Sequence, residues 1–260
     1  MVDSAKAAKL LIAARREGQK MDALPADAEP ANLGDAYAIQ DAIIEQFGLP
    51  PAGWKVALTN DEAMQRAGAN EPAAGPLFAP HIGSGPGVID RHADCVAGFE
   101  CEFAFRLASG LPASGAPYEA ADVKDAIESM HPAIEVVGAR IANRPALGVR
   151  GTVADHAGNF SVVLGNPVPD WAALDLAQCA VRHCVDGNEI AASSGANVLG
   201  NPLNALAWLA NHLAGRGREL EAGHLIITGA ATGPLPGPQG STITGDFGAL
   251  GVVEVRFEGE

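Results

Sequence analysis

The sequence has no long hydrophobic run and few cysteines. No apolar stretch approaches the ~20 residues needed to span a bilayer, so we expect no membrane partner. The first twenty residues suit an amphipathic helix and lack the basic segment and apolar core of a signal peptide. The four cysteines show no CxxC spacing, which is typical of reduced, partly buried thiols. We therefore expect a cytoplasmic protein.

Basic residues are also scarce. Lys and Arg number 17 against 31 Asp and Glu, which gives a formal charge of −14. This balance argues against nucleic acids and anionic membranes as partners, because both call for basic patches on the protein. A small anionic substrate remains compatible, since the local charge in a cleft can oppose the overall charge.

Motifs for nucleotides and for zinc are missing. The segment 229–248 is rich in Gly and Pro but matches neither GxGxxG nor a P-loop. Cys179, His183 and Cys184 resemble a metal cluster only superficially, because strand alternation sends His183 and Cys184 to opposite faces. We expect neither a nucleotide site nor a zinc site.

The pattern along the chain predicts an α+β domain. Its 260 residues, 48% apolar and 18% charged, fit one large globular domain. Residues 72–87 hold many Gly and Pro, as expected of loops and short extended pieces. Helices are expected at 3–18, 33–47, from a cap at Thr59 or Asn60 to about 67, 119–129 and 202–214. Strand-like runs lie at 97–107, 132–137, 160–165, 178–186, 224–228 and 250–257.

Glu100 and Glu102 are the most informative residues. Apolar residues occupy every second position from Phe99 to Leu107, which predicts a strand with Glu100 and Glu102 together on the opposite face. Their Cα atoms would be ~6.7 Å apart, and carboxylate oxygens at about 5 Å would repel by roughly 3 kcal/mol at an effective dielectric of 20. A fold tolerates this if the face is wet, if one carboxylate is protonated, or if a cation lies between them.

Three further residues could carry chemistry. Glu135 lies in an apolar run, where an ionised carboxylate must be paired, bound to a metal or placed outward on an edge strand. Lys55 lies between Trp54 and Val56, so it predicts either a structural ion pair or a functional ammonium. Asp155 precedes His156 in a turn-like segment and could simply cap that turn. Three carboxylates would suit a hard cation such as Mg²⁺ or Mn²⁺.

Six motifs in order along the chain resemble one enzyme family. They are residues 53–59 (GWKVALT), 100–102 (ECE), 132–137 (PAIEVV), 153–155 (VAD), 200–205 (GNPLNA) and 227–229 (ITG). Together they resemble the 2-keto-4-pentenoate hydratase and 4-oxalocrotonate decarboxylase branch of the fumarylacetoacetate hydrolase superfamily. The resemblance implies a mixed β-roll, here a single catalytic domain with a helical N-terminal segment to about residue 70 and the β-roll from about residue 71 to 260. It also implies a homo-oligomer.

The resemblance assigns roles to particular residues. It implies a divalent metal held by Glu100, Glu102 and Glu135, and it places Lys55, Asp155 and Thr228 in the pocket. For the reaction we expect Lys55 and Asp155 to carry protons, and Thr228, Gly229 and Leu77 to contact the substrate.

The sequence departs from the family pattern at three places. Members of this branch carry a small residue and an Asp after the Leu-Phe pair, where this chain has Ala79, Pro80 and His81. His156 stands where Asn is usual, and Gly98-Phe99 replaces a commoner Pro-Arg. We expect His81 or His156 to replace the missing acid as a proton carrier, with His81 the residue chosen, because the ordinary pKa of histidine is about 6.5. A surface histidine in a Gly/Pro loop is the alternative.

The resemblance implies a metal-dependent lyase in the catabolism of aromatic compounds. The leading expectation is hydration of a 2-hydroxypenta-2,4-dienoate-type substrate to a 4-hydroxy-2-oxo acid. Decarboxylation of a 2-oxo acid and C–C hydrolysis of an acylpyruvate are alternatives within the superfamily. A non-catalytic oxo-acid-binding protein or partner subunit, in complex with a pathway enzyme, is an alternative of another class.

Overall fold

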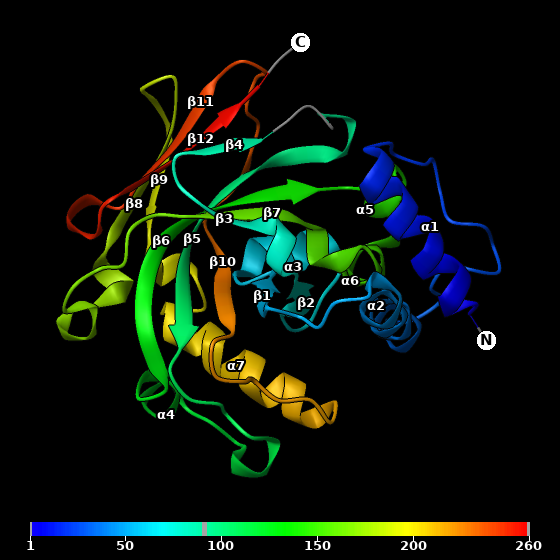
Figure 1. Cartoon of the computed structure of the whole chain (residues 1–260), viewed down its shortest axis with the longest axis horizontal. Helices are drawn as coiled ribbons and strands as arrows, with labels where there is room; N and C mark the ends of the chain where they lie inside the picture. Colours follow the sequence, from blue (N-terminus) through cyan, green and yellow to red (C-terminus); the bar gives the residue numbers. More distant parts are fainter. Residues whose placement is uncertain (1, 90–92, 259–260) are drawn as a thin grey trace.

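The computed structural model describes residues 2–89 and 93–258 (Figure 1). The helices are α1 (Ser4–Glu17), α2 (Leu33–Phe47), α3 (Asp61–Ala67), α4 (Ala120–Lys124), α5 (Arg144–Leu147), α6 (Val149–Ala154) and α7 (Pro202–Gly215). The strands are β1 (Gly53–Ala57), β2 (Ala73–Leu77), β3 (Ile82–Ser84), β4 (Gly87–Ile89), β5 (Val96–Leu107), β6 (Ile127–Gly138), β7 (Asn159–Leu164), β8 (Ala180–Val185), β9 (Asn188–Ser194), β10 (Leu225–Leu235), β11 (Thr242–Asp246) and β12 (Val252–Phe257).

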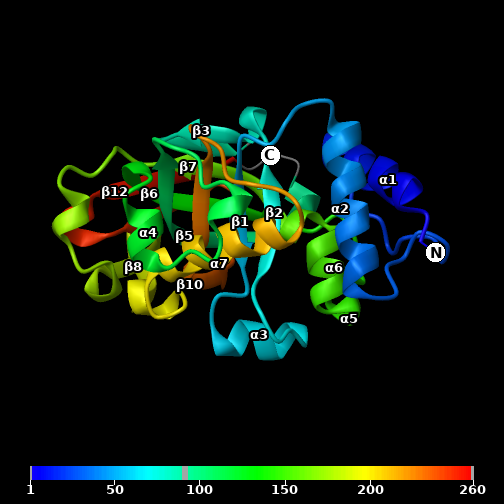
Figure 2. The same cartoon turned by 90° about the horizontal axis from the view of Figure 1, so that it is seen from below.

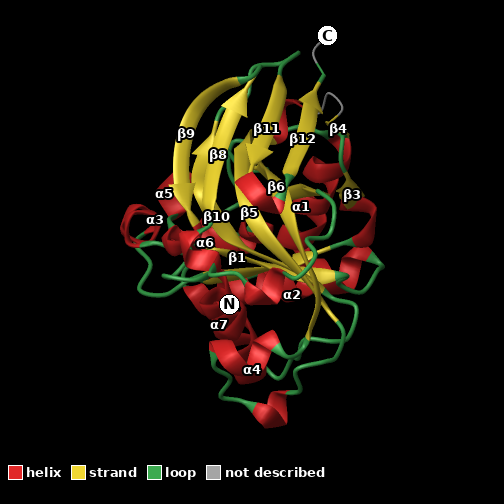
Figure 3. Ribbon diagram, turned by 90° about the vertical axis from the view of Figure 1, so that its left-hand side faces the viewer, coloured by secondary structure: helices red, strands yellow, loops and turns green. Residues whose placement is uncertain are grey.

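The strands form two mixed sheets. The larger has seven strands in the order β2-β1-β10-β5-β6-β7-β3, with parallel pairing only in β1–β10 and β3–β7. The smaller has five strands in the order β4-β12-β11-β8-β9, and Figure 3 shows it curving away from the larger sheet. The long strands β5 and β6 pair antiparallel at the centre of the larger sheet. They are the scaffold on which the acidic residues sit.

The main core fills the space between the two sheets. Its members on β5 are the alternating residues Phe99, Cys101, Phe103 and Phe105, all fully buried. Phe99 packs against Phe257 of the smaller sheet with ring centroids 5.5 Å apart. The period of two predicted for this strand is therefore confirmed, since one of its faces is wholly apolar.

Helices cover the ends of the larger sheet. Helix α7 contacts β10 and β1, and it begins after Asn201, whose side chain accepts a hydrogen bond from the Leu203 N–H with Pro202 at the first position. Helices α1, α2 and α6 build a second apolar cluster with Ala57 and Ala73 at the β1–β2 edge. Figure 2 shows this helical group beside the sheets, with α3 protruding alone.

Most predicted elements are present, and one is wrong. The segment 119–129 forms only a short helix from Ala120 to Lys124, because β6 already begins at Ile127. Strands β1, β2, β3, β4, β9 and β11 are not among the predicted strands, although β2 and β3 lie in the Gly/Pro-rich part of the chain, where short extended pieces were expected. Asn60, and not Thr59, caps α3 by accepting from the Ala63 N–H.

The structure bears on the expected absence of a membrane-spanning helix and on the state of the cysteines. Over residues 2–89 and 93–258, no helix combines the length and apolarity that crossing a membrane requires. The four cysteines are all free thiols.

Candidate active site

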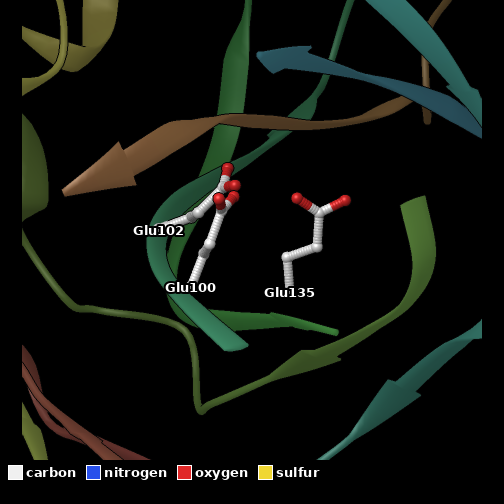
Figure 4. Close-up of side chains that lie close together, drawn as sticks. All are labelled: Glu100, Glu102 and Glu135. Carbon is white, nitrogen blue, oxygen red and sulfur yellow. The ribbon is translucent and has the colours of Figure 1, made fainter. Parts of the chain in front are cut away.

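The register of β5 against β6 brings three carboxylates together (Figure 4). Glu100 lies directly opposite Glu135 in the ladder, and Glu102 lies two residues further along the same face of β5. One oxygen from each of the three side chains lies within 4.8 Å of the others. In the part of the chain that the structure describes, this is the only such group of potential metal ligands. The sequence placed Glu100 and Glu102 on one face, and the fold supplies Glu135.

The acidic face is not wet. Glu102 and Glu135 are 0% exposed, and Glu100 is half-buried. Their neighbours on this face, Ala104 and Ala133, belong to a third apolar cluster. A solvated face, one of the three explanations open at the level of sequence, is therefore wrong. Three carboxylates crowd into a low-dielectric site, which requires protonation or a cation.

Lys55 provides one cation. It projects from β1, is buried, and places Nζ 2.5 Å from Glu135 Oε2. Burial alone would lower the pKa of Lys55, but the charges of Glu135, Glu100 and Glu102 raise it above its ordinary value. The ammonium is therefore charged at neutral pH. Both roles predicted for Lys55, a structural ion pair and a functional ammonium, are compatible with the structure. The reason is that its ion-pair partner, Glu135, belongs to the carboxylate cluster itself.

One ammonium leaves the cluster short of positive charge. Three ionised carboxylates and Lys55 sum to −2. Burial, opposed by Lys55 and reinforced by Glu135, raises the pKa of Glu100 to about 7. Burial and the charge of Glu135 raise the pKa of Glu102 well above its ordinary value. Glu102 Oε1 is buried without a hydrogen-bond partner among the described residues. Oxygen donors, a charge of −2 and an orphaned oxygen fit a divalent hard cation.

Proton competition gives a testable pH dependence. Above about pH 7 Glu100 is ionised in the metal-free protein, whereas below it a proton occupies the carboxylate that a cation needs. Mg²⁺ affinity is therefore expected to fall as the pH drops from about 8 to about 6. Titration calorimetry in two buffers of different ionisation enthalpy should show protons released on binding near pH 7. Equal affinity and no proton release across this range would contradict the assignment.

Glu102 is positioned by the backbone of β10. The Gly229 N–H donates to Glu102 Oε2 at 2.6 Å. Gly229 has φ +99°, and a Cβ there would lie 2.3 Å from Thr59 Oγ1, so only glycine fits. The hydroxyl of the neighbouring Thr228 donates to the Phe103 carbonyl and is fully buried. The structure therefore ties Thr228 and Gly229 to β5 and to Glu102, and leaves their predicted contact with substrate untested.

The Gly229→Ala substitution is expected to weaken both the fold and the metal site. Its methyl group collides with Thr59, and its φ is strained for alanine, which together cost on the order of 1–3 kcal/mol or more. Thermal unfolding and Mg²⁺ titration measure the two effects. Gly215→Ala is the control, because that position at the end of α7 has nothing within 4 Å. Unchanged stability and Mg²⁺ affinity in Gly229→Ala would contradict the role of Gly229.

Glu135 is oriented by Asn159, which the sequence did not single out as a functional residue. Asn159 Nδ2 donates to Glu135 Oε1 at 2.8 Å, while Oε2 faces Lys55. Asn159 follows a tight turn in which His156, Ala157 and Gly158 have positive φ values of 55°, 50° and 83°. Two non-glycine residues in the left-handed region store strain that the surrounding packing maintains. The sequence signal that could have indicated Asn159 is the turn-like segment directly before the strand predicted at 160–165.

A cavity of about 750 Å³ opens beside the cluster. Lys55 and Glu100 line it together with Thr59, Asn197 and Arg144. Asn197 also holds β10, since its Nδ2 donates to the carbonyl of Ala231 at 3.0 Å. Asn197 and Arg144 carried no sequence signal, because neither lies in a patterned segment. The cavity gives a small molecule access to Lys55 and Glu100, behind which Glu102 and Glu135 are buried.

Asp155 does not line this cavity. Its carboxylate is buried and accepts from the Arg140 backbone N–H at 2.9 Å and from Arg140 Nε. A third contact comes from Arg144 Nη1 at 3.4 Å. With its oxygens occupied by two arginines, Asp155 organises the wall behind the cavity. Its predicted role as a proton carrier finds no support in this placement.

His81 lies at a different cavity. Its Nε2 accepts from Arg15 Nε at 3.3 Å, and it lines a cavity of about 550 Å³ with Arg15 and Phe160. Burial and the nearby charges of Arg15 and Arg140 lower the pKa of His81 to about 4. The structure therefore does not bring His81 to the carboxylates, and we do not retain it as a proton carrier. His156, whose burial lowers its pKa well below the ordinary value, is enclosed away from the cavity as well.

Leu77 is a core residue. It pairs with Gly53 in the β1–β2 ladder and packs with Ala104, Ala133 and Ile227. The structure does not place it on the cavity wall. Of the nine residues predicted for the site, it therefore brings Glu100, Glu102, Glu135 and Lys55 together, with Gly229 bonded to the cluster.

Comparison with known proteins identifies relatives that cover nearly the whole chain. The chain is 32% identical to the 2-oxo-hept-4-ene-1,7-dioate hydratase of Escherichia coli, with 96% of each protein covered. It is 30% identical to the 2-keto-4-pentenoate hydratase of Paraburkholderia xenovorans, over 97% of this chain and 94% of that protein. Among solved structures, 4-oxalocrotonate decarboxylase from Pseudomonas putida G7, complexed with magnesium and adipate, superposes with a TM-score of 0.89. That structure is 29% identical over 98% of this chain and 97% of the other.

These similarities confirm the predicted fold type. The superposition covers nearly the whole chain, including the N-terminal helices, so both the mixed sheets and the helical segment are shared. Residues 74–258 match the family described as fumarylacetoacetate (FAA) hydrolase C-terminal. The protein belongs to the fumarylacetoacetate hydrolase family.

Proposed function

We propose that this protein is a divalent-metal-dependent hydro-lyase that hydrates a 2-hydroxypenta-2,4-dienoate-type substrate to a 4-hydroxy-2-oxo acid. The observation that carries the proposal is the cluster of Glu100, Glu102, Glu135 and Lys55, of which Lys55 and Glu100 line an accessible cavity. Full-length identity of 32% and 30% to two hydratases supports the reaction type. Such an enzyme acts in the catabolism of aromatic compounds.

Glu100, Glu102 and Glu135 would hold the cation. Mg²⁺ suits three carboxylate oxygens, and Mn²⁺ accepts the same donors. When bound, the cation would polarise the carboxylate and 2-oxo oxygens of a substrate as a Lewis acid. The Gly229 N–H and the Asn159 amide keep Glu102 and Glu135 in place, so the ligand oxygens are positioned before anything binds.

Lys55 is the proton carrier in this proposal. A 2-hydroxypenta-2,4-dienoate becomes electrophilic at C4 only after a proton reaches C5 and the enol becomes an α,β-unsaturated ketone, and this proton transfer requires a positioned donor. Lys55 lines the cavity, holds its proton at neutral pH and is fixed by Glu135. It is also the only lysine of the cavity wall within the described residues. Substituting Lys55 removes the proton donor and leaves all three carboxylates of the cluster in the chain.

Decarboxylation is the second candidate. The similarity to a solved 4-oxalocrotonate decarboxylase at a TM-score of 0.89 favours it specifically. It would use the same carboxylates and lose CO₂ where the hydratase gains water. C–C hydrolysis of an acylpyruvate would need a base that activates water, and within the described residues no histidine lines the cavity.

We also propose that the protein forms a homo-oligomer in solution, as the family resemblance implies. Analytical sedimentation would test this proposal.

One experiment separates these reactions. Metal-loaded protein is incubated with 2-hydroxypenta-2,4-dienoate, 4-oxalocrotonate and an acylpyruvate, while ultraviolet absorbance and product mass are followed. The expected product of the first gains the mass of one water. Loss of CO₂ from the second substrate alone would favour the decarboxylase instead.

Removal of metal from the protein with a chelator is expected to abolish turnover, and added Mg²⁺ is expected to restore it. Turnover that is unaffected by the chelator would contradict metal dependence.

A further inference from the structure

A second cavity, of about 550 Å³, lies between the end of α1 and strands β3, β4 and β7. Cavities that bind small molecules have volumes of roughly 300–1,000 Å³, so this one has room for a ligand. Within the described residues, it shares no lining residue with the cavity beside the carboxylates. Its polar lining residues are Arg15, Arg16, His81, Ser84 and Ser161. It is therefore a separate site whose charged lining is cationic.

Arg15 is a buried cation whose hydrogen bonds all go to neutral groups. It is 6% exposed. Its Nε donates to His81 Nε2 at 3.3 Å, its Nη1 to the Asn159 carbonyl at 2.8 Å, and its Nη2 to the Phe160 carbonyl. A guanidinium has five N–H donors, so one N–H on each Nη has no acceptor among the described residues. These two donors can bind the two oxygens of one carboxylate.

Within the described residues, no free carboxylate neutralises Arg15. Asp155 and Glu135 are the carboxylates whose charges act on it, and each already has a buried cation as its ion-pair partner. Glu17 and Glu258 are exposed and do not line the cavity, so water and salt screen their charges. Burial and the charge of Arg140 lower the pKa of Arg15 to about 9. A bound anion would supply the counter-charge that a buried guanidinium requires.

The rest of the cavity lining is largely apolar. Its large apolar members are Ile82, Val88, Ile89, Phe160, Val162 and Val163. Val88 is 58% exposed, so a ligand in the cavity would cover apolar surface that now faces water. Ser161 Oγ is buried and has no hydrogen-bond partner among the described residues, which leaves it free to donate to a ligand. The lining therefore suits an anion that carries an apolar body.

Hydrogen bonds connect this cavity to the carboxylate cluster. The Asn159 carbonyl accepts from Arg15, and the Asn159 side chain donates to Glu135 Oε1 at 2.8 Å. Glu135 is one of the three carboxylates assigned to the metal, and the positive charge of Arg15 acts on it. An anion bound to Arg15 would offset that charge. Glu135 would then attract a cation more strongly, while Asn159 keeps it oriented.

We infer that this cavity is an effector site for a monocarboxylate with a compact apolar body, whose carboxylate binds Arg15, and that its occupancy strengthens metal binding at Glu135 through Asn159. The inference concerns a second site and does not depend on which reaction the first site catalyses. His81 has a positioning role here, because its neutral ring accepts from Arg15 Nε and fixes the guanidinium.

The binding test compares benzoate, its uncharged isostere benzamide, and inorganic phosphate. Titration calorimetry is run on metal-free protein, so that no cation can hold the carboxylate, and is repeated with Mg²⁺. Benzoate is expected to bind about 10-fold or more tightly than benzamide, as a charge-assisted hydrogen bond provides. Burial of the ring should give it about a 10-fold advantage over phosphate as well. Absent benzoate binding, or equal binding of benzamide, would overturn the inference, and phosphate binding as tightly as benzoate would overturn the apolar part of the ligand.

The coupling test measures Mg²⁺ affinity with and without saturating benzoate. The dissociation constant of Mg²⁺ is expected to fall by about 5-fold or more, and Mg²⁺ should tighten benzoate binding by the same factor. Unchanged Mg²⁺ affinity would overturn the coupling. A fall that persists unchanged in Arg15→Gln would overturn it too, because the effect would then not pass through Arg15.

Two variants assign benzoate to this cavity. Arg15→Gln is expected to reduce the preference for benzoate over benzamide to about 3-fold or less, and Arg15→Lys to retain part of it. Arg150→Gln is the matched control, because Arg150 also donates to the carbonyls of two successive residues and does not line the cavity. An unchanged preference in Arg15→Gln would overturn the assignment.

Val88→Asp keeps the test decisive if Arg15→Gln does not fold. Val88 is exposed on β4, so the substitution leaves the core intact and adds a negative charge to the cavity lining. It is expected to weaken benzoate by about 5-fold or more and to leave benzamide unchanged. Ile190→Asp is its control, since Ile190 is an exposed apolar residue of β9, in the same sheet, that does not line the cavity. Equal benzoate binding by these two variants would place the ligand elsewhere and overturn the inference.

Discussion

Lys55→Met is expected to lower kcat by about 10²-fold or more, which is the range of general acid–base contributions. Methionine keeps the apolar stem that fits beside Trp54 and Val56 and removes only the ammonium group. The loss follows because Lys55 Nζ is the proton-bearing group at the cavity wall, 2.5 Å from Glu135. Steady-state turnover of the dienoate measures it. Mg²⁺ affinity is expected to persist, since all three carboxylates remain.

The effect of Lys55→Met on stability depends on the metal. Without metal, the substitution leaves three buried carboxylates with no cation, although protonation of Glu100, with its pKa of about 7, limits the cost. With saturating Mg²⁺, the melting temperature is expected to lie within a few degrees of wild type. Lys124→Met is the control, because that half-buried lysine, which does not belong to the carboxylate cluster, also makes one hydrogen bond, to the Ala172 carbonyl. Wild-type kcat with a large loss of stability in Mg²⁺ would make Lys55 structural.

Glu102→Gln is expected to weaken Mg²⁺ binding by about 10²-fold or more. Changes to groups that only orient a metal ligand cost 10–100-fold, roughly, so loss of an anionic ligand itself should cost at least as much. Glu102 is fully buried, and its Oε1 has no partner among the described residues, so it is available to a cation. Its Oε2 already accepts from the Gly229 N–H, which the glutamine oxygen can still do. Calorimetric titration measures the change.

The metal-free Glu102→Gln protein provides an internal check. Burial and the charge of Glu135 raise the pKa of Glu102, so the ionised carboxylate opposes folding, and a neutral amide removes that opposition. The melting temperature without metal is therefore expected to hold or rise while Mg²⁺ stabilisation disappears. Glu128→Gln, on an exposed position of β6, should change neither quantity. Unchanged Mg²⁺ affinity in Glu102→Gln would remove this residue from the site.

Local sequence pattern was enough to predict β5. Alternation from Phe99 to Leu107 placed Glu100 and Glu102 on one face, because successive side chains in a strand point to opposite sides. It also determined where α7 begins, since Asn201 and Pro202 form a local helix start. These features depend on neighbours within a few residues. The apolar content then required that β5 bury one face, and the structure buries both.

Which charged groups come into contact depends on the long-range pairing of the strands. Lys55 and Glu135 are 80 residues apart in the chain, and Gly229 and Glu102 are 127 apart. Their contacts follow from the pairing of β1, β10, β5 and β6, which is set by packing over the whole sheet rather than by local pattern. The same packing turned Asp155 toward Arg140, placed His81 against Arg15, and brought Arg144 to the cavity. Local periodicity says which face a side chain occupies, whereas long-range register says what it faces.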